Sequence, residues 1–173
     1  PSSVKSIGDL CFSKCGFLSQ ISIPSSVSVF GQKIFEGIRS LDISGDLNII
    51  CDNMFNGCTE LEQITIPSSV VEIGSYAFCE CSLMKSFSIP SSVNSIGAGS
   101  FSRCTSLSHI EIPSSVTLIG NGCFFRCESL EKIEIPSSSL EICDYSFDGC
   151  LSFTDISIPS SVTKIGSDAF NGC

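Results

Sequence analysis

A segment of about twenty-three residues recurs along the whole chain, and this repetition limits the possible folds more than any other feature. It is clearest in residues 67–89, PSSVVEIGSYAFCECSLMKSFSI. A period of roughly 20 to 29 residues with apolar residues at fixed offsets indicates stacked supersecondary units rather than a globule. We therefore expect a single repeat array over residues 1–173, whose last copy stops after fifteen residues. The copies begin at Pro1, Pro24, Ser44, Pro67, Pro90, Pro113, Pro136 and Pro159.

One copy departs from this period. Residues 24–43 form a copy of only twenty residues, because three are missing between Ile38 and Leu41. The same copy carries Phe30 where isoleucine is usual, and the next copy opens on Ser44-Gly45-Asp46 instead of Pro-Ser-Ser. Drift in a tolerant array accounts for such a copy. The alternative is a local groove or a change of curvature that a partner recognises.

The copy from Pro113 shows how each unit is built. Leu130, Ile133 and Ile135 have the L-x-x-L-x-L spacing, which predicts a half-buried strand with Lys132 and Glu134 on its exposed face. The proline that follows ends the strand, since it has a fixed φ and no N–H to donate. The two serines after it offer hydroxyls to backbone groups at the bend.

The second half of the unit predicts a return path. The V-x-x-I-G segment indicates a short extended stretch closed by a glycine turn, and the i, i+3 spacing of F-x-x-C suits one turn of 3₁₀ or α-helix. We expect an α/β repeat solenoid that is rich in strand. It would have a parallel β-sheet on one face and short 3₁₀ or helical turns on the other.

These positions carry a resemblance to the BspA-like leucine-rich repeats, whose pattern is L-x-x-I-x-I-P-x-S-V-x-x-I-G-x-x-A-F-x-x-C. The match covers the whole chain, although the alanine before phenylalanine occurs only as Ala77 and Ala169. The resemblance implies a right-handed leucine-rich-repeat coil. It also implies binding of proteins, because BspA-like proteins are associated with adhesion to host proteins. The positions are shown by Leu107, Ile110, Ile112, Pro113, Ser115, Val116, Ile119, Gly120, Phe124 and Cys127.

Composition excludes some classes of protein. With 42% apolar residues the chain is not a disordered tail, and no apolar run approaches the length of a membrane span, so we expect no membrane insertion. The net charge of −9 disfavours nucleic acid and anionic membrane surfaces as partners. Because the chain opens on Pro1 and both ends resemble interior units, we expect a piece of a longer array without its caps, flanked by further repeats of the same chain.

Twelve cysteines are present, and seven of them share one repeat position. The remaining copy has Ile38 there, so we expect a buried position filled by free thiols. Vertically neighbouring cysteines would still lie within disulfide range, so spacing alone does not exclude a bridge. Many free cysteines favour a reducing compartment, and the absence of N-x-S/T acceptors points the same way. The seven are Cys15, Cys58, Cys81, Cys104, Cys127, Cys150 and Cys173.

Phenylalanine fills one repeat position in all eight copies. An aromatic stripe can line a ligand site, but repetition through every unit indicates stacked rings in the core. The residues are Phe12, Phe35, Phe55, Phe78, Phe101, Phe124, Phe147 and Phe170.

Enzyme chemistry finds no support among the motifs. There is no nucleophile with a paired base, no glycine-rich phosphate loop and no H-E-x-x-H, so we expect neither catalysis nor a cofactor. A metal site is not expected either, because there is no C-x-x-C and His109 is the only histidine.

Variable polar residues gather on the exposed face of the strands. In the first half of the array they are mostly hydroxyls and amides, whereas charge is concentrated on three adjacent strands of the second half. Lateral ion pairs of little energetic value are one interpretation. The other is a polar patch for a protein partner, formed by His109, Glu111, Glu131, Lys132, Glu134 and Asp155.

Three functions compete, in this order. The first, favoured by the resemblance, is an interaction array on the surface of a microbial cell. The second is an intracellular structural array, cytoplasmic or cytoskeletal, that packs against a filament or a larger assembly; the free cysteines favour it. The third is ice or crystal binding by a flat hydroxyl array, which Asp42, Glu111 and Glu134 interrupt.

Overall fold

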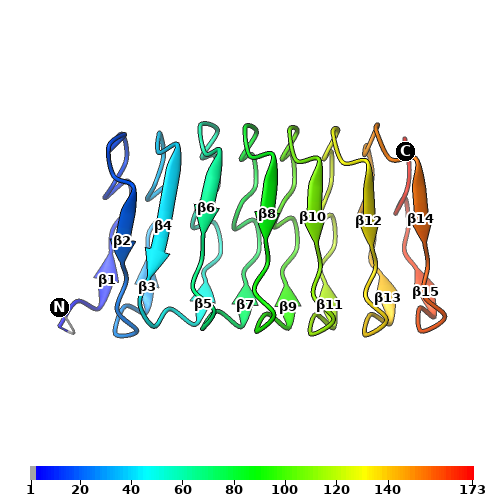
Figure 1. Cartoon of the computed structure of the whole chain (residues 1–173), viewed down its shortest axis with the longest axis horizontal. Coiled ribbons are helices and arrows are strands. Elements are labelled where there is room, and N and C mark those ends of the chain that lie inside the picture. Colours follow the sequence, from blue (N-terminus) through cyan, green and yellow to red (C-terminus); the bar gives the residue numbers. More distant parts are fainter. Residues whose placement is uncertain (1–2) are drawn as a thin grey trace.

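The chain winds into a flat, elongated coil whose two ends lie at opposite ends of the molecule (Figure 1). The computed structural model describes residues 3–173, so Pro1 and Ser2, where the first copy begins, lie outside the described residues. Each repeat makes one circuit of the coil. A complete repeat contributes one strand to a front sheet and one two-residue strand to a second ladder behind it, whereas the last copy contributes only to the second ladder.

The front strands are the L-x-x-I-x-I segments, and neighbouring strands run parallel. Hydrogen bonds join them as three groups, β2–β4–β6, β8–β10 and β12–β14. The predicted parallel sheet on one face is therefore confirmed. Its strands are β2 (Gln20–Ser22), β4 (Ser40–Ser44), β6 (Gln63–Thr65), β8 (Ser86–Ser88), β10 (His109–Glu111), β12 (Lys132–Glu134) and β14 (Asp155–Ser157).

The short extended stretches of the V-x-x-I-G segments form the second ladder, which we call the back ladder. It also runs parallel, in the groups β1–β3, β5–β7–β9–β11 and β13–β15. The strands are β1 (Ser6–Ile7), β3 (Val29–Phe30), β5 (Ile49–Ile50), β7 (Glu72–Ile73), β9 (Ser95–Ile96), β11 (Leu118–Ile119), β13 (Glu141–Ile142) and β15 (Lys164–Ile165).

The predicted 3₁₀ or helical turns are wrong: residues 3–173 contain no helix, and the F-x-x-C segments form consecutive tight turns. In the circuit around Phe101, Gly99 and Arg103 have φ of 61° and 59°, and each is the third residue of a turn closed by an i to i+3 hydrogen bond. A positive φ at that position is the mark of a type II turn and is incompatible with a helix. The N–H groups between these bonds donate to the next circuit, as Phe101 N does to Cys123 O at 2.9 Å.

The Pro-Ser-Ser bend also ties one circuit to the previous one. The proline carbonyl accepts the N–H of the residue three positions on, as in Val116 N to Pro113 O at 3.0 Å. The second serine donates its hydroxyl across circuits, as Ser115 Oγ does to Val93 O at 2.6 Å. The abundant serines are thus structural hydrogen-bond donors rather than a reactive surface.

Glycine at the end of V-x-x-I-G lets adjacent circuits approach. A Cβ atom at Gly120 would lie 2.4 Å from Ala98 N, and one at Gly97 would lie 2.6 Å from Ser75 N. Two copies carry cysteine here instead, Cys51 and Cys143. The back ladder is interrupted at these two copies, between β3 and β5 and between β11 and β13. A side chain at this position thus holds the preceding circuit away, whereas every copy with glycine that has a preceding circuit pairs with it.

The short copy changes the register of the front sheet. Strand β4 pairs with β6 in the repeat register, Leu41 opposite Ile64, but Ile21 of β2 lies opposite Ile43, two residues beyond Leu41. Because side chains alternate with a period of two, this shift keeps the same face buried. At the irregular copy the structure therefore shows a slip along the front strands, accompanied by the opening between β3 and β5.

The phenylalanine position forms a continuous column through the core. Successive rings lie 5.0 to 5.6 Å apart between centroids and within 15° of parallel. The six inner rings are fully buried, whereas Phe12 and Phe170 in the end circuits are partly buried.

The shared cysteine position is also internal, and the inner thiols make one repeated hydrogen bond. Cys104 Sγ donates to Phe78 O at 3.1 Å, and Cys127 Sγ donates to Phe101 O at 3.1 Å. All twelve cysteines are free thiols. The prediction of a buried position is wrong for Cys15 and Cys173, which are exposed because they lie in the end circuits.

Burial disfavours the thiolate form of these side chains. It raises the pKa of Cys58 and of Cys150 to about 12 from an ordinary value of 9.0, and it also raises the pKa of Cys104. Buried thiols with a raised pKa are poor nucleophiles, so the buried cysteines at the shared position have a structural role.

Phe101→Ala is expected to lower the free energy of unfolding by about 3 to 5 kcal/mol, because it leaves a cavity between two stacked rings. Chemical denaturation monitored by circular dichroism measures this. Phe17→Ala is the matched control, since Phe17 is fully exposed, and its change should be small. A loss below about 1 kcal/mol for Phe101→Ala would mean that the column is not the core.

The raised thiol pKa values predict alkaline destabilisation. The unfolded chain releases thiol protons near pH 9 whereas buried Cys58 and Cys150 hold theirs to about pH 12, so the stability is complete below pH 9 and falls between these values. Denaturation at pH 7 and pH 10 should show this fall in the free energy of unfolding, and Cys104→Ala should reduce the difference between the two pH values.

A thiol reagent should modify all twelve cysteines of the unfolded, unreduced chain. A result showing most of them blocked would contradict the prediction that the cysteines are free thiols.

Candidate functional site

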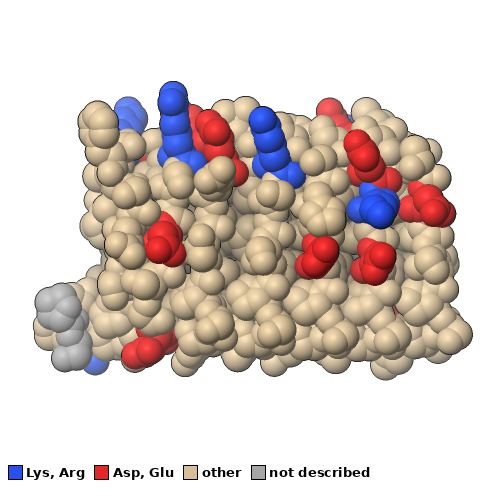
Figure 2. All heavy atoms as spheres, viewed as in Figure 1, with Lys and Arg blue, Asp and Glu red and all other residues tan. Residues whose placement is uncertain are grey.

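The charged cluster predicted on the strand face is brought together by β10, β12 and β14 and the residue before β12. Figure 2 shows acidic side chains and one basic side chain gathered over these strands, while the face over β6 and β8 is largely uncharged. All six residues are exposed. They are His109, Glu111, Glu131, Lys132, Glu134 and Asp155.

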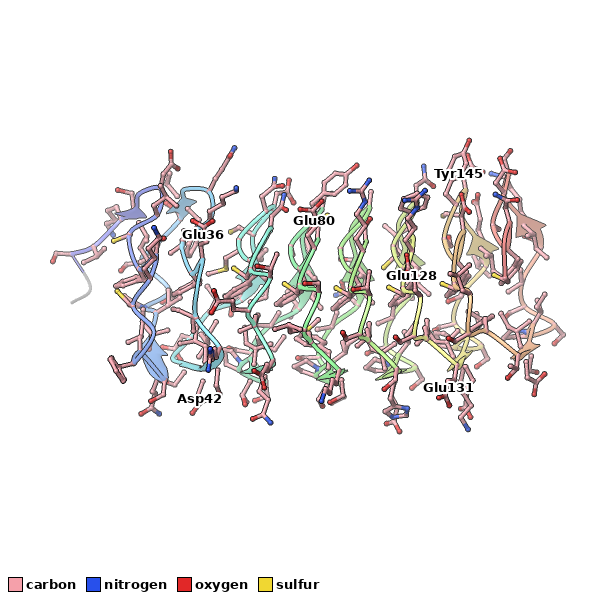
Figure 3. The ribbon with its side chains drawn as sticks, turned by 90° about the horizontal axis from the view of Figure 1, so that it is seen from above. Glu36, Asp42, Glu80, Glu128, Glu131 and Tyr145 are labelled. Carbon is pink, nitrogen blue, oxygen red and sulfur yellow. The ribbon has the colours of Figure 1, made fainter. Side chains whose placement is uncertain are left out.

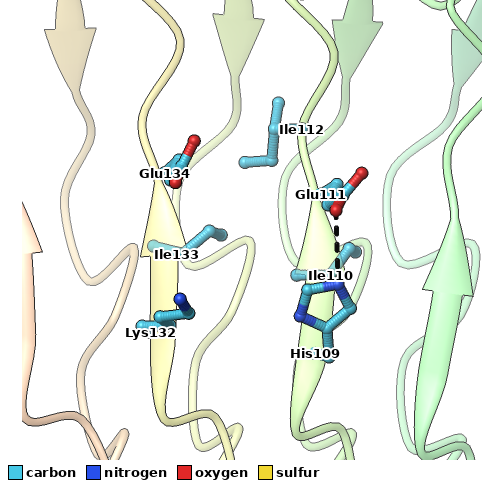
Figure 4. Close-up of a pocket in the computed structure, with 7 residues that line it drawn as sticks. All are labelled: His109, Ile110, Glu111, Ile112, Lys132, Ile133 and Glu134. Atoms are coloured by element: carbon cyan, nitrogen blue, oxygen red, sulfur yellow. Dashed lines mark ion pairs between the residues drawn. The ribbon is translucent and has the colours of Figure 1, made fainter.

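Within this cluster, β10 and β12 carry side chains of the same kind side by side, acids at one level and bases at another. Glu111 and Glu134 lie at one level, and His109 and Lys132 at another (Figure 4). The close contact between an acidic and a basic side chain lies within one strand, His109 Nε2 to Glu111 Oε1 at 3.6 Å, and it is an ion pair only when the imidazole is protonated. Lateral ion pairing, the alternative interpretation of this charge, therefore does not connect β10 to β12.

The charge pattern lies at one of the two interruptions of the front sheet, the other being between β6 and β8. No ladder joins β10 to β12, although β8–β10 and β12–β14 are both paired. On the paired side of β12, Lys132 lies opposite Asp155, which is a favourable arrangement. The front sheet is also interrupted between β6 and β8, whose residues carry no charge, so an interruption does not require like charges. Between β10 and β12, Glu111 beside Glu134 adds an unfavourable pair.

A hollow of about 330 Å³ opens between β10 and β12. Isoleucines form its floor and the charged side chains form its rim. It offers a partner carboxylates, a lysine, an imidazole and the unpaired facing edges of two strands. The lining residues are His109, Ile110, Glu111, Ile112, Lys132, Ile133 and Glu134.

A second surface, on the turn side, was not predicted. Both tyrosines of the chain and one of its three arginines line a shallow trough across the tight turns, together with Phe125. Tyr76 lies over Gly99, and Arg103 pairs with Glu80 at 3.2 Å. Figure 3 shows Tyr145 and Glu80 on the side opposite Asp42 and Glu131. Tyr76 and Tyr145 occupy the same repeat position, nine residues after Pro67 and Pro136, so the repeat register is the sequence signal that places them on one surface.

Metal-binding clusters and membrane-spanning helices are both absent from residues 3–173. No group of three or more histidine, cysteine, aspartate or glutamate side chains in that range could hold a metal ion. Over the same range, the chain has no helix of the length and hydrophobicity that a membrane span requires.

Comparison with known proteins agrees with this architecture. The family model for the BspA type leucine rich repeat region matches six copies, over residues 1–85 and 71–173. No curated protein matches the chain.

Solved structures share the same coil. A leucine-rich-repeat protein of T. pallidum is 30% identical with a TM-score of 0.72, and the match covers 100% of this chain and 74% of that one. A leucine-rich cell surface protein of Faecalibacterium prausnitzii is 22% identical with a TM-score of 0.52, over 98% of this chain and 75% of that one. A leucine-rich-repeat protein of Bacteroides ovatus is 26% identical with a TM-score of 0.50, over 100% of this chain and 63% of that one.

Proposed function

The chain belongs to the BspA-type leucine-rich-repeat family, and we propose that it is a non-enzymatic array that binds a protein partner through its strand face. The observation that carries this proposal is the hollow between β10 and β12, where the charged cluster coincides with one of the two interruptions of the front sheet. Repeat proteins of this kind generally bind proteins over an extended surface.

The chemistry of the cluster fits a polar protein surface. Glu111 and Glu134 would face basic groups of the partner, which would relieve their mutual repulsion. Lys132 lies beside them to select against a uniformly basic surface. Charged groups at such a site steer association and fix the choice of partner more than they add affinity. The net charge of −9 favours a partner with a basic patch and disfavours nucleic acid.

For the location, we propose a microbial cell surface and a role in adhesion. The support is the family resemblance, together with the fold shared with the Faecalibacterium prausnitzii protein, whose description is that of a cell surface protein. Adhesion by repeats gains strength from area and from copy number, because many weak contacts act together.

A second candidate is an intracellular structural array that packs against a filament or a larger assembly. The observation that favours it is the set of twelve free thiols, five of them buried at the shared position. Free cysteines in this number persist most readily in a reducing compartment.

Charge reversal at both central acids, Glu111→Lys with Glu134→Lys, is expected to weaken partner binding by about tenfold or more while the melting temperature changes little. Calorimetry or surface plasmon resonance with the isolated partner measures the affinity. Glu62→Lys with Glu128→Lys is the matched control, since it makes the same change in net charge on exposed acids outside the cluster. Equal losses in the two double variants would mean that total charge, and not the strand face, governs binding.

Staining of the protein in fixed cells separates the two locations and identifies where to search for the partner. Staining of intact cells is the result expected for adhesion. Staining only after permeabilisation would replace adhesion with the intracellular array and would leave the strand-face proposal in place.

A further inference from the structure

The back ladder is open between β3 and β5, on the side of the coil away from the strand-face cluster. No Cα atom of β3 lies within 8 Å of a Cα atom of β5. On the front, β4 and β6 remain paired, and in the core the rings of Phe35 and Phe55 stack at 5.0 Å. The two circuits are therefore joined in front and at the core, and they separate only behind.

This opening differs from the other interruption. At the seam between β11 and β13, which Cys143 interrupts, the strands stay within 8 Å of each other. The seam between β3 and β5 combines Cys51 with the short copy and its two-residue slip. The replaced glycine and the short copy therefore coincide at this seam. The gap between β3 and β5 is wider than the gap between β11 and β13.

More than 8 Å separates the Cα atoms of β3 from those of β5, which is well beyond the spacing of two paired strands. Adjacent strands lie about 4.8 Å apart, so a strand inserted between two others needs roughly 9.6 Å between them. The facing backbone groups are free in the described chain. Closed seams have bonds such as Val71 N to Asn48 O at 2.8 Å and Gly74 N to Ile50 O at 2.7 Å. The corresponding donors here, Asn48 N and Cys51 N, have no acceptor, and the corresponding acceptors, Ser28 O and Phe30 O, have no donor.

The walls of the opening indicate what kind of segment fits. Val29 is 60% exposed and Ile49 is 41% exposed, and with Phe30 they line two adjoining hollows of about 430 and 260 Å³. Asp46, Asp52 and Glu72 also line these hollows, and no lysine or arginine does. An extended segment with apolar side chains and basic flanks is complementary to these walls.

We propose that the seam between β3 and β5 binds an extended, basic and apolar peptide segment of another protein, which completes the back ladder as an inserted parallel strand. The inserted strand accepts hydrogen bonds from Asn48 N and Cys51 N and donates to Ser28 O and Phe30 O. Main-chain pairing of this kind supplies affinity, and the apolar walls and acidic rim supply selectivity. This site is separate from the strand face, so either proposal can fail without the other.

The probe is a synthetic peptide that carries the chain's own back-ladder segment, residues 113–120 (PSSVTLIG), with two lysines added at each end and a fluorescent label. Binding to the full chain is measured by anisotropy at physiological salt. Three control peptides accompany it: one with glutamates at the ends, one with the same composition in scrambled order, and one N-methylated at alternate residues, which cannot donate the ladder hydrogen bonds.

Saturable binding of the lysine-flanked peptide is expected, with affinity at least about tenfold weaker for each control peptide. In the protein, Val29→Glu with Ile49→Glu is expected to abolish binding. These side chains are exposed, so the fold tolerates the change. Cys51→Gly is expected to weaken binding by at least about tenfold, because it allows β5 to approach β3. Cys143→Gly, at the narrower seam, should bind as the parent does.

Absence of binding to the parent chain would overturn the proposal. Equal binding of the N-methylated or scrambled peptide would overturn it too, since binding would then be electrostatic attraction to an acidic surface. Undiminished binding to Val29→Glu with Ile49→Glu would place the peptide elsewhere. The strand-face variants at Glu111 and Glu134 should leave peptide binding unchanged, which separates this test from that of the proposed function.

Discussion

The distance between successive circuits, about 4.8 Å in any hydrogen-bonded sheet, decides which residues this chain can carry at each repeat position. At that distance every side chain stands directly on its counterpart from the previous repeat. Flat rings stack, as the phenylalanines do, and a small thiol reaches the carbonyl of the circuit before it. A Cβ atom at the position of Gly120 has no room at all. The same residue types recur in the sequence because the same distance recurs between successive circuits.

The places where the stack is broken are where partners can be expected. The facing acids Glu111 and Glu134 lie at one of the two interruptions of the front sheet, and Cys51 and Cys143 accompany the two breaks in the back ladder. Regular circuits satisfy their own backbone groups, so they offer a partner only side chains. Interrupted circuits offer free backbone donors and acceptors as well. In this protein the exceptions to the repeat, rather than the repeat itself, carry the candidate binding sites.

Much of the fold could be predicted from the residues alone, because a core position carries the same type of residue at the same offset in every copy. The parallel front sheet, the ring column and the family all follow from the fixed offsets of leucine, isoleucine, phenylalanine and cysteine. The turns were mispredicted because F-x-x-C has the same i, i+3 spacing in a helical turn and in two successive type II turns. Positive φ at Tyr76 and Arg103 is not readable from residues that are neither glycine nor asparagine. The exposure of Cys15 and Cys173 follows from their end circuits and not from their repeat position. The breaks in the ladders depend on how closely two circuits approach at one glycine, a distance that no sequence pattern contains.

The causal role of that glycine position is tested most directly at Cys143, because its circuit has the normal length. In closed seams the N–H groups at this position and three residues before it are bonded, as Gly120 N is to Ile96 O at 2.8 Å and Thr117 N is to Asn94 O at 2.9 Å. Amide hydrogen exchange measured by NMR should find the amides of Leu140 and Cys143 unprotected in the parent chain. In Cys143→Gly both should become as protected as those of Thr117 and Gly120. Protection already present in the parent, or its absence in the variant, would contradict the claim that a single side chain opens the seam.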